Sequence, residues 1–260
     1  MSGNSWRFIN SGLQAGVYNM QFDEALARSL QEGGSTPSLR IFRWKPWAIS
    51  LGYNQGAAEI NANRCREEGI DIVRRPTGGR AILHAEELTY SVVMYAGRKG
   101  ILQVYNEISS ALVRGLRLFG VDATLQRSQP NFSEEYKHPS SIPCFTSSAR
   151  YEIEWQGRKL VGSAQRRFAD GTRDVVLQHG SILCGPAHRG LANYLVVNDS
   201  RVLDRIRSEM ESKTVDLSEI TGTVVDVTGL GECIKLGFEQ EWHVTFSERF
   251  EEAVDEHSPA

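Results

Sequence analysis

The chain has 260 residues, of which 40% are hydrophobic and 23% are charged, and its formal net charge is −3. This composition is typical of a globular protein with enough chain to bury a substantial core, and the charge excludes a general attraction to nucleic acid. No apolar run reaches the length of a membrane span, and the first residues lack a signal pattern, so we expect a cytoplasmic protein without nucleic-acid or membrane partners.

The first part of the chain predicts strands and short helices in turn. Residues 7–12 have strand character, and residues 19–34 carry apolar side chains at helical spacing before a Gly-Gly stop. Residues 38–55 are rich in aromatic and β-branched side chains and are broken at Lys45-Pro46, which predicts a hairpin. A short helix over residues 60–69 and strands over 70–79, 80–85 and 88–95 follow.

The second part predicts an amphipathic helix over residues 104–120, a strand over 122–127 and a polar loop over 128–143. Residues 149–155 and 159–168 form a predicted hairpin around Gln156-Gly157, and 174–184 form another strand. Two or three helices, including residues 200–210 and 246–254, and a flexible tail over 251–260 complete the chain. This order predicts an α+β fold with a mixed, largely antiparallel sheet flanked by helices.

The segment RRPTGGRAILH, residues 74–84, combines charge with a sharp turn. Thr77, Gly78 and Gly79 let the backbone approach a ligand closely, and its N–H groups there suit an anion or a carbonyl oxygen. The spacing matches neither a Walker loop nor a dinucleotide motif, and an ordinary turn between strands is the alternative. His84 lies on an apolar strand, where a half-buried structural histidine is equally compatible with the pattern.

The four cysteines, Cys65, Cys144, Cys184 and Cys233, form no CxxC pair and no zinc-type spacing, so we expect no metal site. Cys144 follows a polar loop, whereas Cys184 lies in an apolar run. A reactive thiol needs a nearby base or positive charge, and Lys159, after the predicted hairpin turn, is the candidate. The alternative is an inert thiol with a solvated lysine.

Small side chains interrupt two neighbouring strands. Gly162, Ser163 and Ala164 follow one another in one strand, and His179 and Gly180 lie on the next. Small residues weaken a strand unless something packs closely against it, so the run suits a narrow apolar slot for a chain-like substrate. A bulge or a tight contact between sheets is the alternative.

In this order, RRPTGGRAILH, GRKLVGSAQRR and QHGSIL resemble the lipoate-protein ligase and octanoyltransferase family, and NMQFDEAL and ISLGYNQ upstream fit the same pattern. The resemblance implies a central mixed sheet with helices around it, related to the catalytic domain of biotin protein ligases, in a single acyltransferase domain over residues 1–250. It implies acyl transfer to a lysine of a lipoyl carrier domain, with Lys159 as the functional lysine near the acyl carbonyl. The implied acyl pocket is lined by Arg75, Thr77, Gly78, Gly79, His84, Gly162, Ser163, Ala164, His179 and Gly180.

Two chemistries occur in this family. Ligases activate lipoate with ATP and magnesium, whereas the transferases that this chain resembles hold an octanoyl or lipoyl group on a cysteine and use no cofactor. The segment PCF with Cys144 and the form TGGR with Arg80 resemble the transferases. The resemblance then implies octanoyl-acyl carrier protein as donor, a lipoyl domain or glycine-cleavage H-type protein as acceptor, and a monomer.

An ATP-dependent lipoate-protein ligase is the alternative, and a non-catalytic protein that kept the pocket is a third interpretation. One position departs from the family pattern. Ala85 follows His84 where the family usually has an aspartate, which weakens the ligase interpretation if that acid organises a nucleotide and metal. Glu86 and Glu87 are the candidates to replace it.

Overall fold

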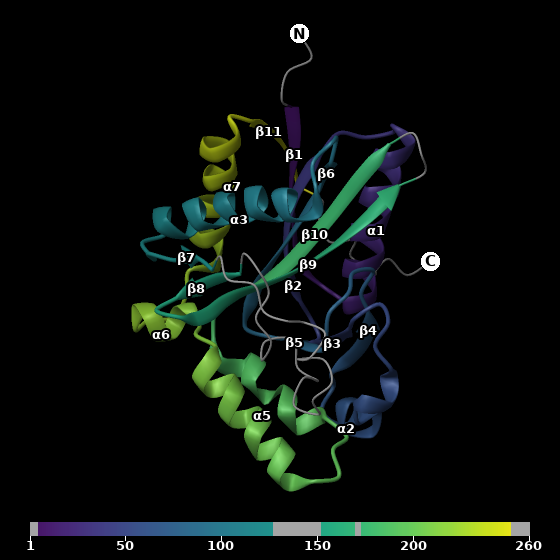
Figure 1. Cartoon of the computed structure of the whole chain (residues 1–260), viewed down its shortest axis with the longest axis vertical. Coiled ribbons are helices and arrows are strands. Elements are labelled where there is room, and N and C mark those ends of the chain that lie inside the picture. Colours follow the sequence, from purple (N-terminus) through teal and green to yellow (C-terminus); the bar gives the residue numbers. More distant parts are fainter. Residues whose placement is uncertain (1–4, 127–151, 170–172, 251–260) are drawn as a thin grey trace, which may run out of the picture.

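The computed structural model describes residues 5–126, 152–169 and 173–250 (Figure 1). Within them, an eight-stranded sheet has the order β11-β1-β2-β6-β10-β9-β8-β7. Its strands are β1 (Ser5–Gln14), β2 (Ser38–Trp44), β6 (Glu87–Tyr95), β7 (Thr124–Leu125), β8 (Ile153–Trp155), β9 (Arg158–Ala169), β10 (Asp174–Leu183) and β11 (Thr245–Phe250). β1 pairs parallel with β2 and β11, and the remaining neighbours pair antiparallel, which confirms the predicted mixed, largely antiparallel sheet.

A smaller three-stranded sheet has the order β4-β3-β5, with β3 (Ala48–Leu51), β4 (Asp71–Arg74) and β5 (Ile82–His84). The predicted hairpin over residues 38–55 is therefore wrong, because β2 pairs with β1 and β6 while β3 pairs with β4 and β5. β2 is buried along nearly its whole length, so it needs a neighbour on each side. The break at Lys45-Pro46 separates two sheets rather than two arms of one hairpin.

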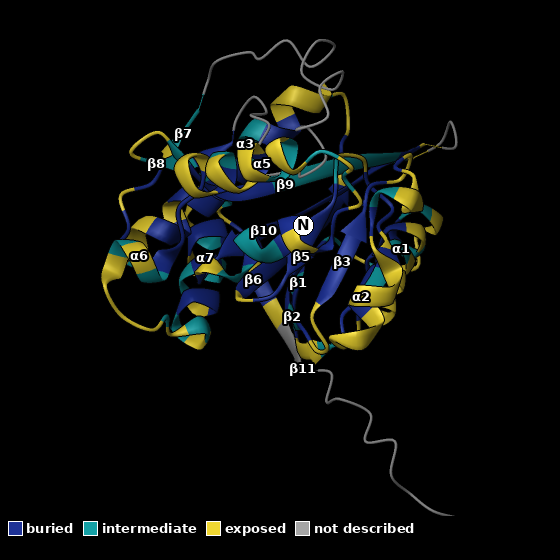
Figure 2. Cartoon of the chain, turned by 90° about the horizontal axis from the view of Figure 1, so that it is seen from below, coloured by how far each residue is buried: buried dark blue, intermediate teal, exposed yellow. Residues whose placement is uncertain are grey.

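Helices cover both faces of the large sheet. They are α1 (Gly16–Glu32), α2 (Ala62–Glu67), α3 (Ile101–Leu118), α5 (Ser200–Lys213), α6 (Leu217–Thr221) and α7 (Val227–Trp242), with 3-10 segments η1 (Ala57–Glu59) and η4 (Pro186–Tyr194). Along β6, Tyr90 and Val92 pack with α3 and α7, whereas Val93 packs with α1, because successive strand residues point to opposite faces. Figure 2 shows the sheet buried between helices whose outer sides are exposed.

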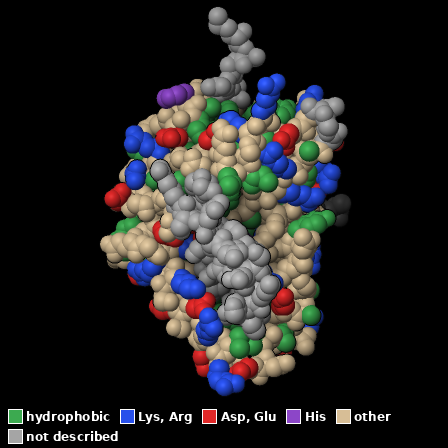
Figure 3. Space-filling view, in the orientation of Figure 1, with side chains coloured by type: hydrophobic (Ala, Val, Ile, Leu, Met, Phe, Trp, Pro, Cys, Tyr) green, Lys and Arg blue, Asp and Glu red, His purple; other side chains and the backbone are tan. Residues whose placement is uncertain are grey.

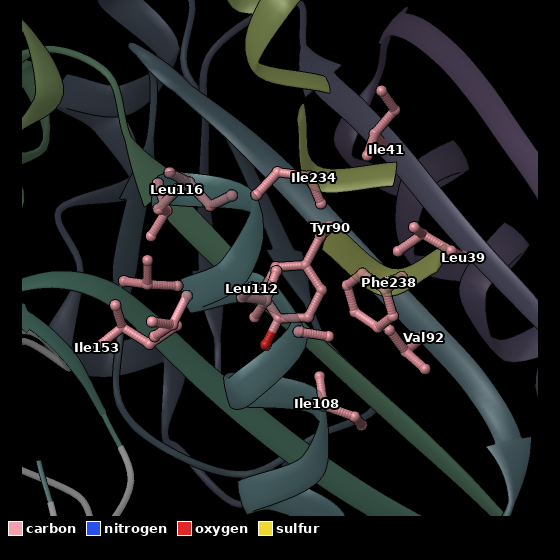
Figure 4. Packing of buried hydrophobic residues seen from close by; sticks show 14 of the residues in the cluster. Leu39, Ile41, Tyr90, Val92, Ile108, Leu112, Leu116, Ile153, Ile234 and Phe238 are labelled. Atoms are coloured by element: carbon pink, nitrogen blue, oxygen red, sulfur yellow. The ribbon is translucent and has the colours of Figure 1, made fainter. Parts of the chain in front are cut away.

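The main core lies between the large sheet and the helices α3 and α7. Figure 4 shows the ring of Tyr90 among Leu112 of α3 and Phe238 of α7. The two helices approach so closely that a Cβ atom at Gly237 would lie 2.5 Å from the backbone nitrogen of Gly115. Glycine at these positions therefore sets the distance between the helices.

The predicted helix over residues 246–254 is wrong in its described part, because β11 extends over Thr245–Phe250 and pairs with β1. Phe246 explains the difference, since its ring packs edge-on against Trp6 in the main core. The helical spacing of this short segment is weaker than the gain from adding a paired strand to an open sheet edge. The predicted tail over residues 251–260 lies outside the described residues.

The small sheet packs against the large one through Met20, Phe42, Trp44, Ala48 and Val73. Its other side is covered by α2, η4 and α5. No helix in the described part of the chain is long and apolar enough to cross a membrane. Acidic and basic side chains are interspersed over the described surface in the view of Figure 3.

Candidate functional site

A narrow hollow lies where the two sheets and α1 meet. Strands β6, β9 and β10 of the large sheet supply one wall, and β5 with the loop after β4 supplies another. The lining residues are Met20, Trp44, Arg75, Ile82, His84, Thr89, Gly162, Ser163, Ala164, His179, Gly180 and Ser181. The three sequence segments that carry the resemblance therefore meet around one hollow.

Most of the predicted substrate residues line this hollow, namely Arg75, His84, Gly162, Ser163, Ala164, His179 and Gly180. Thr77, Gly78 and Gly79 are not among its described lining residues, although Thr77 is hydrogen-bonded to His179. Gly180 is required by packing, because a Cβ atom there would lie 2.4 Å from the carbonyl oxygen of Gly162. Small residues on β9 and β10 thus allow the two strands to pack closely where they line the hollow.

Arg75 organises the loop that follows β4. Its guanidinium group donates hydrogen bonds to the carbonyl oxygens of Gly78 and Arg80 at 2.7–3.0 Å and to the hydroxyl of Ser50 at 3.0 Å. Gly52 packs directly on the same loop, since a Cβ atom there would overlap the carbonyl oxygen of Gly79. These contacts explain why the segment containing Gly52 accompanies the glycine loop in the sequence pattern.

His179 is held by a buried chain of polar groups. Its Nδ1 lies 3.0 Å from Asp23 Oδ2, its Nε2 lies 2.6 Å from Thr77 Oγ1, and Arg40 donates to Asp23 Oδ1 at 2.9 Å. Burial alone would raise the pKa of Asp23, but the hydrogen bond from His179 and the charge of Arg40 bring it below its usual value. Arg40 also donates to the side-chain oxygen of Asn19 at 2.7 Å.

A second polar cluster surrounds His84. Its Nδ1 lies 2.8 Å from Glu87 Oε1, and its ring stacks on Trp44 with a centroid distance of 3.9 Å. The same carboxylate oxygen accepts hydrogen bonds from Thr89 at 2.6 Å and Ser181 at 2.8 Å. Burial would raise the pKa of Glu87, yet the charge of His84 and these hydrogen bonds lower it below its usual value.

The hollow is lined by polar residues but presents mainly carbon to its interior. Thr89 accepts a hydrogen bond from Trp44 Nε1 at 2.7 Å and donates one to Glu87. The hydroxyl of Ser163 is hydrogen-bonded to the hydroxyl of Tyr90 at 2.7 Å, and burial raises the pKa of Tyr90 to about 12. Because the polar atoms bond one another, the free surface suits an apolar chain.

Lys159 lies on β9 and is not among the described lining residues. Its ammonium group is 2.5 Å from Glu152 Oε1, and both side chains are buried. Burial raises the pKa of the neighbouring Glu154, and the charge of Lys159 opposes this. Cys144 lies outside the described residues, so its predicted pairing with Lys159 stays a prediction.

Burial disfavours the thiolate form of each cysteine that the structure describes. Burial raises the pKa of Cys184 to about 12, and it also raises the pKa values of Cys65 and Cys233. A thiol with a raised pKa is protonated at neutral pH and is a weak nucleophile. Among the described residues, no group of three or more His, Cys, Asp or Glu is arranged to hold a metal ion.

The acidic residues after His84 have different surroundings. Ala85 is buried in the apolar cluster beneath the small sheet, and Glu86 accepts a hydrogen bond at 3.1 Å from the backbone of Ala187. Only Glu87 of the two candidate acids is hydrogen-bonded to His84.

Sequence reasoning missed Trp44, Thr89 and Ser181 of the lining, and it missed Asp23 and Arg40, which support the lining from behind. A signal for two of them was present. Asp23 lies among the apolar positions of the helix over residues 19–34, and Arg40 lies inside a strand, where an unpaired charge would be costly. Their mutual ion pair depends on how α1 packs on β2, which no local pattern reveals.

The family model named lipoyl protein ligase A/B catalytic domain matches residues 15–239 of this chain. A relative named octanoyltransferase LipM from Kyrpidia tusciae is 40% identical over 90% of this chain and 86% of its own length. A protein of the same name from Bacillus subtilis is 35% identical over 92% of this chain and 87% of its own.

Solved structures share the fold. A bipartite lipoate protein ligase from Thermoplasma acidophilum, reported in an archaeal lipoylation system with an E2 lipoyl domain, superposes with a TM-score of 0.74 at 20% identity. That match covers 95% of this chain and 88% of the other. A lipoate-protein ligase A bound with ATP gives a TM-score of 0.73 at 23% identity, covering 95% and 89% of the two chains.

Proposed function

Because the chain belongs to the lipoyl protein ligase A/B catalytic domain family, we propose that it is an octanoyltransferase of protein lipoylation. It moves an octanoyl group from a carrier-protein thioester to a lysine of a lipoyl carrier domain. The observation that carries this proposal is the hollow between the sheets, to which all three motif segments contribute lining residues and which presents mainly carbon. An alkyl chain is the ligand that such a surface accepts most favourably.

The octanoyl chain lies in the hollow against Gly162, Ser163 and Ala164 of β9, with His179 and Gly180 on the neighbouring strand. His84 and Arg75 form the opposite wall. The loop with Thr77, Gly78 and Gly79 supplies backbone N–H groups for the oxygen atom of the acyl carbonyl. Donors already in place when charge develops on that oxygen lower the barrier without further rearrangement.

In the first step, the Cys144 thiolate, stabilised by the Lys159 ammonium group, attacks the carbonyl carbon of the donor thioester. The bond between that carbon and the carrier sulfur breaks, and the carrier sulfur takes the proton from the Lys159 ammonium group. The octanoyl group is then held as a thioester on Cys144. Exchange between two thioesters changes the free energy little, so no activation of the acyl group is needed.

In the second step, the amine of the acceptor lysine attacks the Cys144 thioester. The amine loses a proton to neutral Lys159, the carbon–sulfur bond of Cys144 breaks, and an amide forms. The Cys144 sulfur leaves as a thiolate, and the Lys159 ammonium group is restored beside it. Lys159 thus acts as acid and base in turn, a role that requires a side chain able to gain and lose a proton.

Glu152 supports Lys159 in this role. The buried ion pair at 2.5 Å stabilises the ammonium form that waits to protonate the departing carrier. Because both partners are buried, the pair also holds the lysine side chain in one place.

The reaction proposed here uses no cofactor, since the acyl group arrives as a thioester. An ATP-dependent lipoate ligase would need ATP and magnesium and would release pyrophosphate. The relatives named octanoyltransferase favour transfer over ligation. Measuring pyrophosphate after adding lipoate, ATP and magnesium separates the two, and we expect none to form.

The proposed donor is octanoyl-acyl carrier protein, and the proposed acceptor is a lipoyl domain or a glycine-cleavage H-type protein. An octanoyltransferase name for the relatives supports the donor, and the lipoyl domain reported with the archaeal ligase supports the acceptor. We propose that the enzyme acts as a monomer in the cytoplasm. Mixing each acceptor with octanoyl-acyl carrier protein and the enzyme shows which one gains an octanoyl group by intact mass.

The cysteine step is tested by incubating the protein with octanoyl-acyl carrier protein and measuring its intact mass. We expect one octanoyl adduct that hydroxylamine removes, that is absent in Cys144→Ala and that persists in Cys233→Ala. Cys233 is a matched control because it is a partly exposed thiol on α7, away from the hollow. Normal octanoylation of a lipoyl domain by Cys144→Ala would contradict the mechanism.

A further inference from the structure

The side chains of Asp23, His179 and Thr77 are linked by hydrogen bonds and take no part in the proton transfers proposed for the acyl transfer. His179 lines the hollow, whereas Asp23 and Thr77 are fully buried and are not among the described lining residues. Both ring nitrogens of His179 are within hydrogen-bond distance of these two side chains, at 3.0 Å and 2.6 Å. These two hydrogen bonds therefore link α1, β10 and the glycine loop through the imidazole ring of His179.

The partners decide which nitrogen of His179 carries the proton. Asp23 Oδ1 accepts a hydrogen bond from Arg40 at 2.9 Å, and the lowered pKa of Asp23 keeps its carboxylate ionised. An ionised carboxylate can only accept a hydrogen bond, so Nδ1 of His179 must be the donor to Oδ2. In a neutral ring the other nitrogen then has a lone pair and accepts from the hydroxyl of Thr77.

The ring of His179 is neutral at neutral pH. Burial is the largest of the effects that lower its pKa, and the charges of Arg75 and His84 act in the same direction. Together they outweigh Asp23, which raises the pKa. A charged imidazolium would add a second buried positive charge near the guanidinium group of Arg75. A neutral ring with both nitrogens bonded presents only its carbon edge to a ligand.

We propose that Asp23 and Thr77 are positioning residues for acyl binding, because they fix His179 as the Nδ1–H tautomer and occupy both of its nitrogens. His179 is thereby an apolar part of the wall in spite of its polar side chain. Thr77 is not a nucleophile in this arrangement, since its hydroxyl proton is directed to Nε2 and its side chain is fully buried. This inference rests on the proposed function only in taking an octanoyl chain as the ligand.

Thr77→Val tests the inference because valine keeps the shape of threonine and removes its hydroxyl. His179 Nε2 then becomes a buried acceptor without a partner that borders the hollow. Binding of octanoic acid, measured by isothermal calorimetry, is expected to weaken about tenfold, which corresponds to about 1.4 kcal/mol. Thr77→Ser restores the hydroxyl and most of the affinity, and Thr245→Val, at an exposed position of β11, is the matched control that leaves it unchanged.

Hydroxylated octanoic acids separate this role from a general loss of packing. A hydroxyl group on the chain can donate to the freed Nε2, so Thr77→Val should weaken at least one hydroxyoctanoic acid much less than octanoic acid. Equal weakening of all ligands, or unchanged binding of octanoic acid, would overturn the inference. The melting temperature of each variant shows whether a loss follows from unfolding.

Nitrogen-15 NMR of the wild-type protein with labelled histidine provides a readout that depends on neither activity nor mutation of Thr77. The signals of His179 are assigned by their absence in His179→Gln. We expect a proton on Nδ1 and none on Nε2 at neutral pH, and the opposite tautomer or an imidazolium would overturn the inference. Transfer of octanoyl groups by wild-type protein, assayed in parallel, shows separately whether the proposed function holds.

Discussion

Trp44, Thr89 and Glu87 illustrate how polar residues form an apolar surface. Trp44 donates a hydrogen bond to Thr89, and Thr89 donates one to Oε1 of Glu87, which lies outside the described lining. Each hydrogen bond made within the wall removes a polar atom from the hollow and avoids the cost of leaving it unpaired. The polarity of the surface that a ligand meets therefore depends on the hydrogen bonds among the lining residues and not on residue type alone.

Lys159 provides a prediction at the residue scale. Lys159→Arg keeps a positive charge for the buried Glu152 carboxylate but cannot give up a proton at physiological pH. We expect a melting temperature close to that of the wild type and a fall in kcat of at least about a hundredfold. Lys159→Met should lose activity and also stability, since it leaves a buried carboxylate uncompensated.

Thermal melting and steady-state transfer of octanoyl groups to a lipoyl domain measure both effects. If Lys159→Arg transferred octanoyl groups at the normal rate, proton transfer by Lys159 would be excluded. Its charge alone would then account for its place in the site.

Gly180 provides a second prediction at this scale. Gly180→Ala forces a methyl group to within 2.4 Å of the Gly162 carbonyl oxygen and 2.8 Å of the Tyr90 ring, so β9 and β10 must separate locally. We expect a loss of about 1–3 kcal/mol in the free energy of unfolding and a raised KM for the octanoyl donor. Urea denaturation and donor titration measure these changes.

Gly56→Ala is the control for Gly180→Ala, because a Cβ atom at Gly56 meets nothing within 4 Å. It should leave both quantities near their wild-type values. Equal stability of Gly180→Ala and the wild type would show that the strands adjust freely, contrary to the close packing described above.

At the scale of elements, the sequence largely predicts where helices and strands occur, but it does not predict which strands pair with one another. The apolar stripe predicts a helix over residues 104–120, and the structure has one over Ile101–Leu118 in which Ile108, Leu112 and Leu116 are fully buried. The assignment of β2 and β3 to separate sheets was missed because alternation indicates which residues are buried and not which strand lies alongside. The helix predicted over residues 246–254 is instead the strand β11 in its described part, because Phe246 packs against Trp6 in the main core.

η4 carries a prediction about pH. His188 is buried on η4, with Nε2 at 2.8 Å from Thr214 Oγ1, and burial lowers its pKa to about 4. Since the unfolded chain protonates this histidine near its ordinary value of about 6.5, the unfolded state binds more protons between these two pH values. Stability should therefore fall as the pH decreases from about 6.5 to about 4, by roughly 3 kcal/mol in total from this group.

Urea denaturation across this range, with His188→Gln for comparison, measures the contribution. The variant should show a shallower loss of stability on acidification. His243→Asn is the control, because His243 is exposed at the end of α7 and asparagine tolerates its left-handed backbone. Parallel pH profiles of wild type and His188→Gln would contradict the assignment.

At the scale of the whole molecule, the family and part of the lining of the hollow are predictable from three short motifs. Arg75, His84 and Gly162 were placed at the site from the sequence, and they line it. The supporting ion pair of Asp23 and Arg40 was not predictable, because it forms only when α1 crosses β2 in the complete fold. Ala85 belongs to the apolar cluster of the small sheet.

The arrangement of the two sheets assigns separate tasks to the parts of the molecule. The large sheet and its helices α3 and α7 form most of the core, and the small sheet closes the hollow over β6, β9 and β10. A bound acyl chain contacts both sheets, so it should stabilise the folded state by mass action. We expect saturating octanoic acid to raise the melting temperature of the wild type, and no increase would contradict binding in this hollow.

Transfer from an isolated acyl-enzyme tests the central claim most directly. The enzyme is loaded with isotope-labelled octanoyl groups from acyl carrier protein, separated from the donor, and mixed with a lipoyl domain in the absence of ATP. The account predicts that the label leaves the enzyme and appears on the lysine of the domain within a few turnover times. A label that stays on the enzyme, or that moves only when ATP is added, would contradict it.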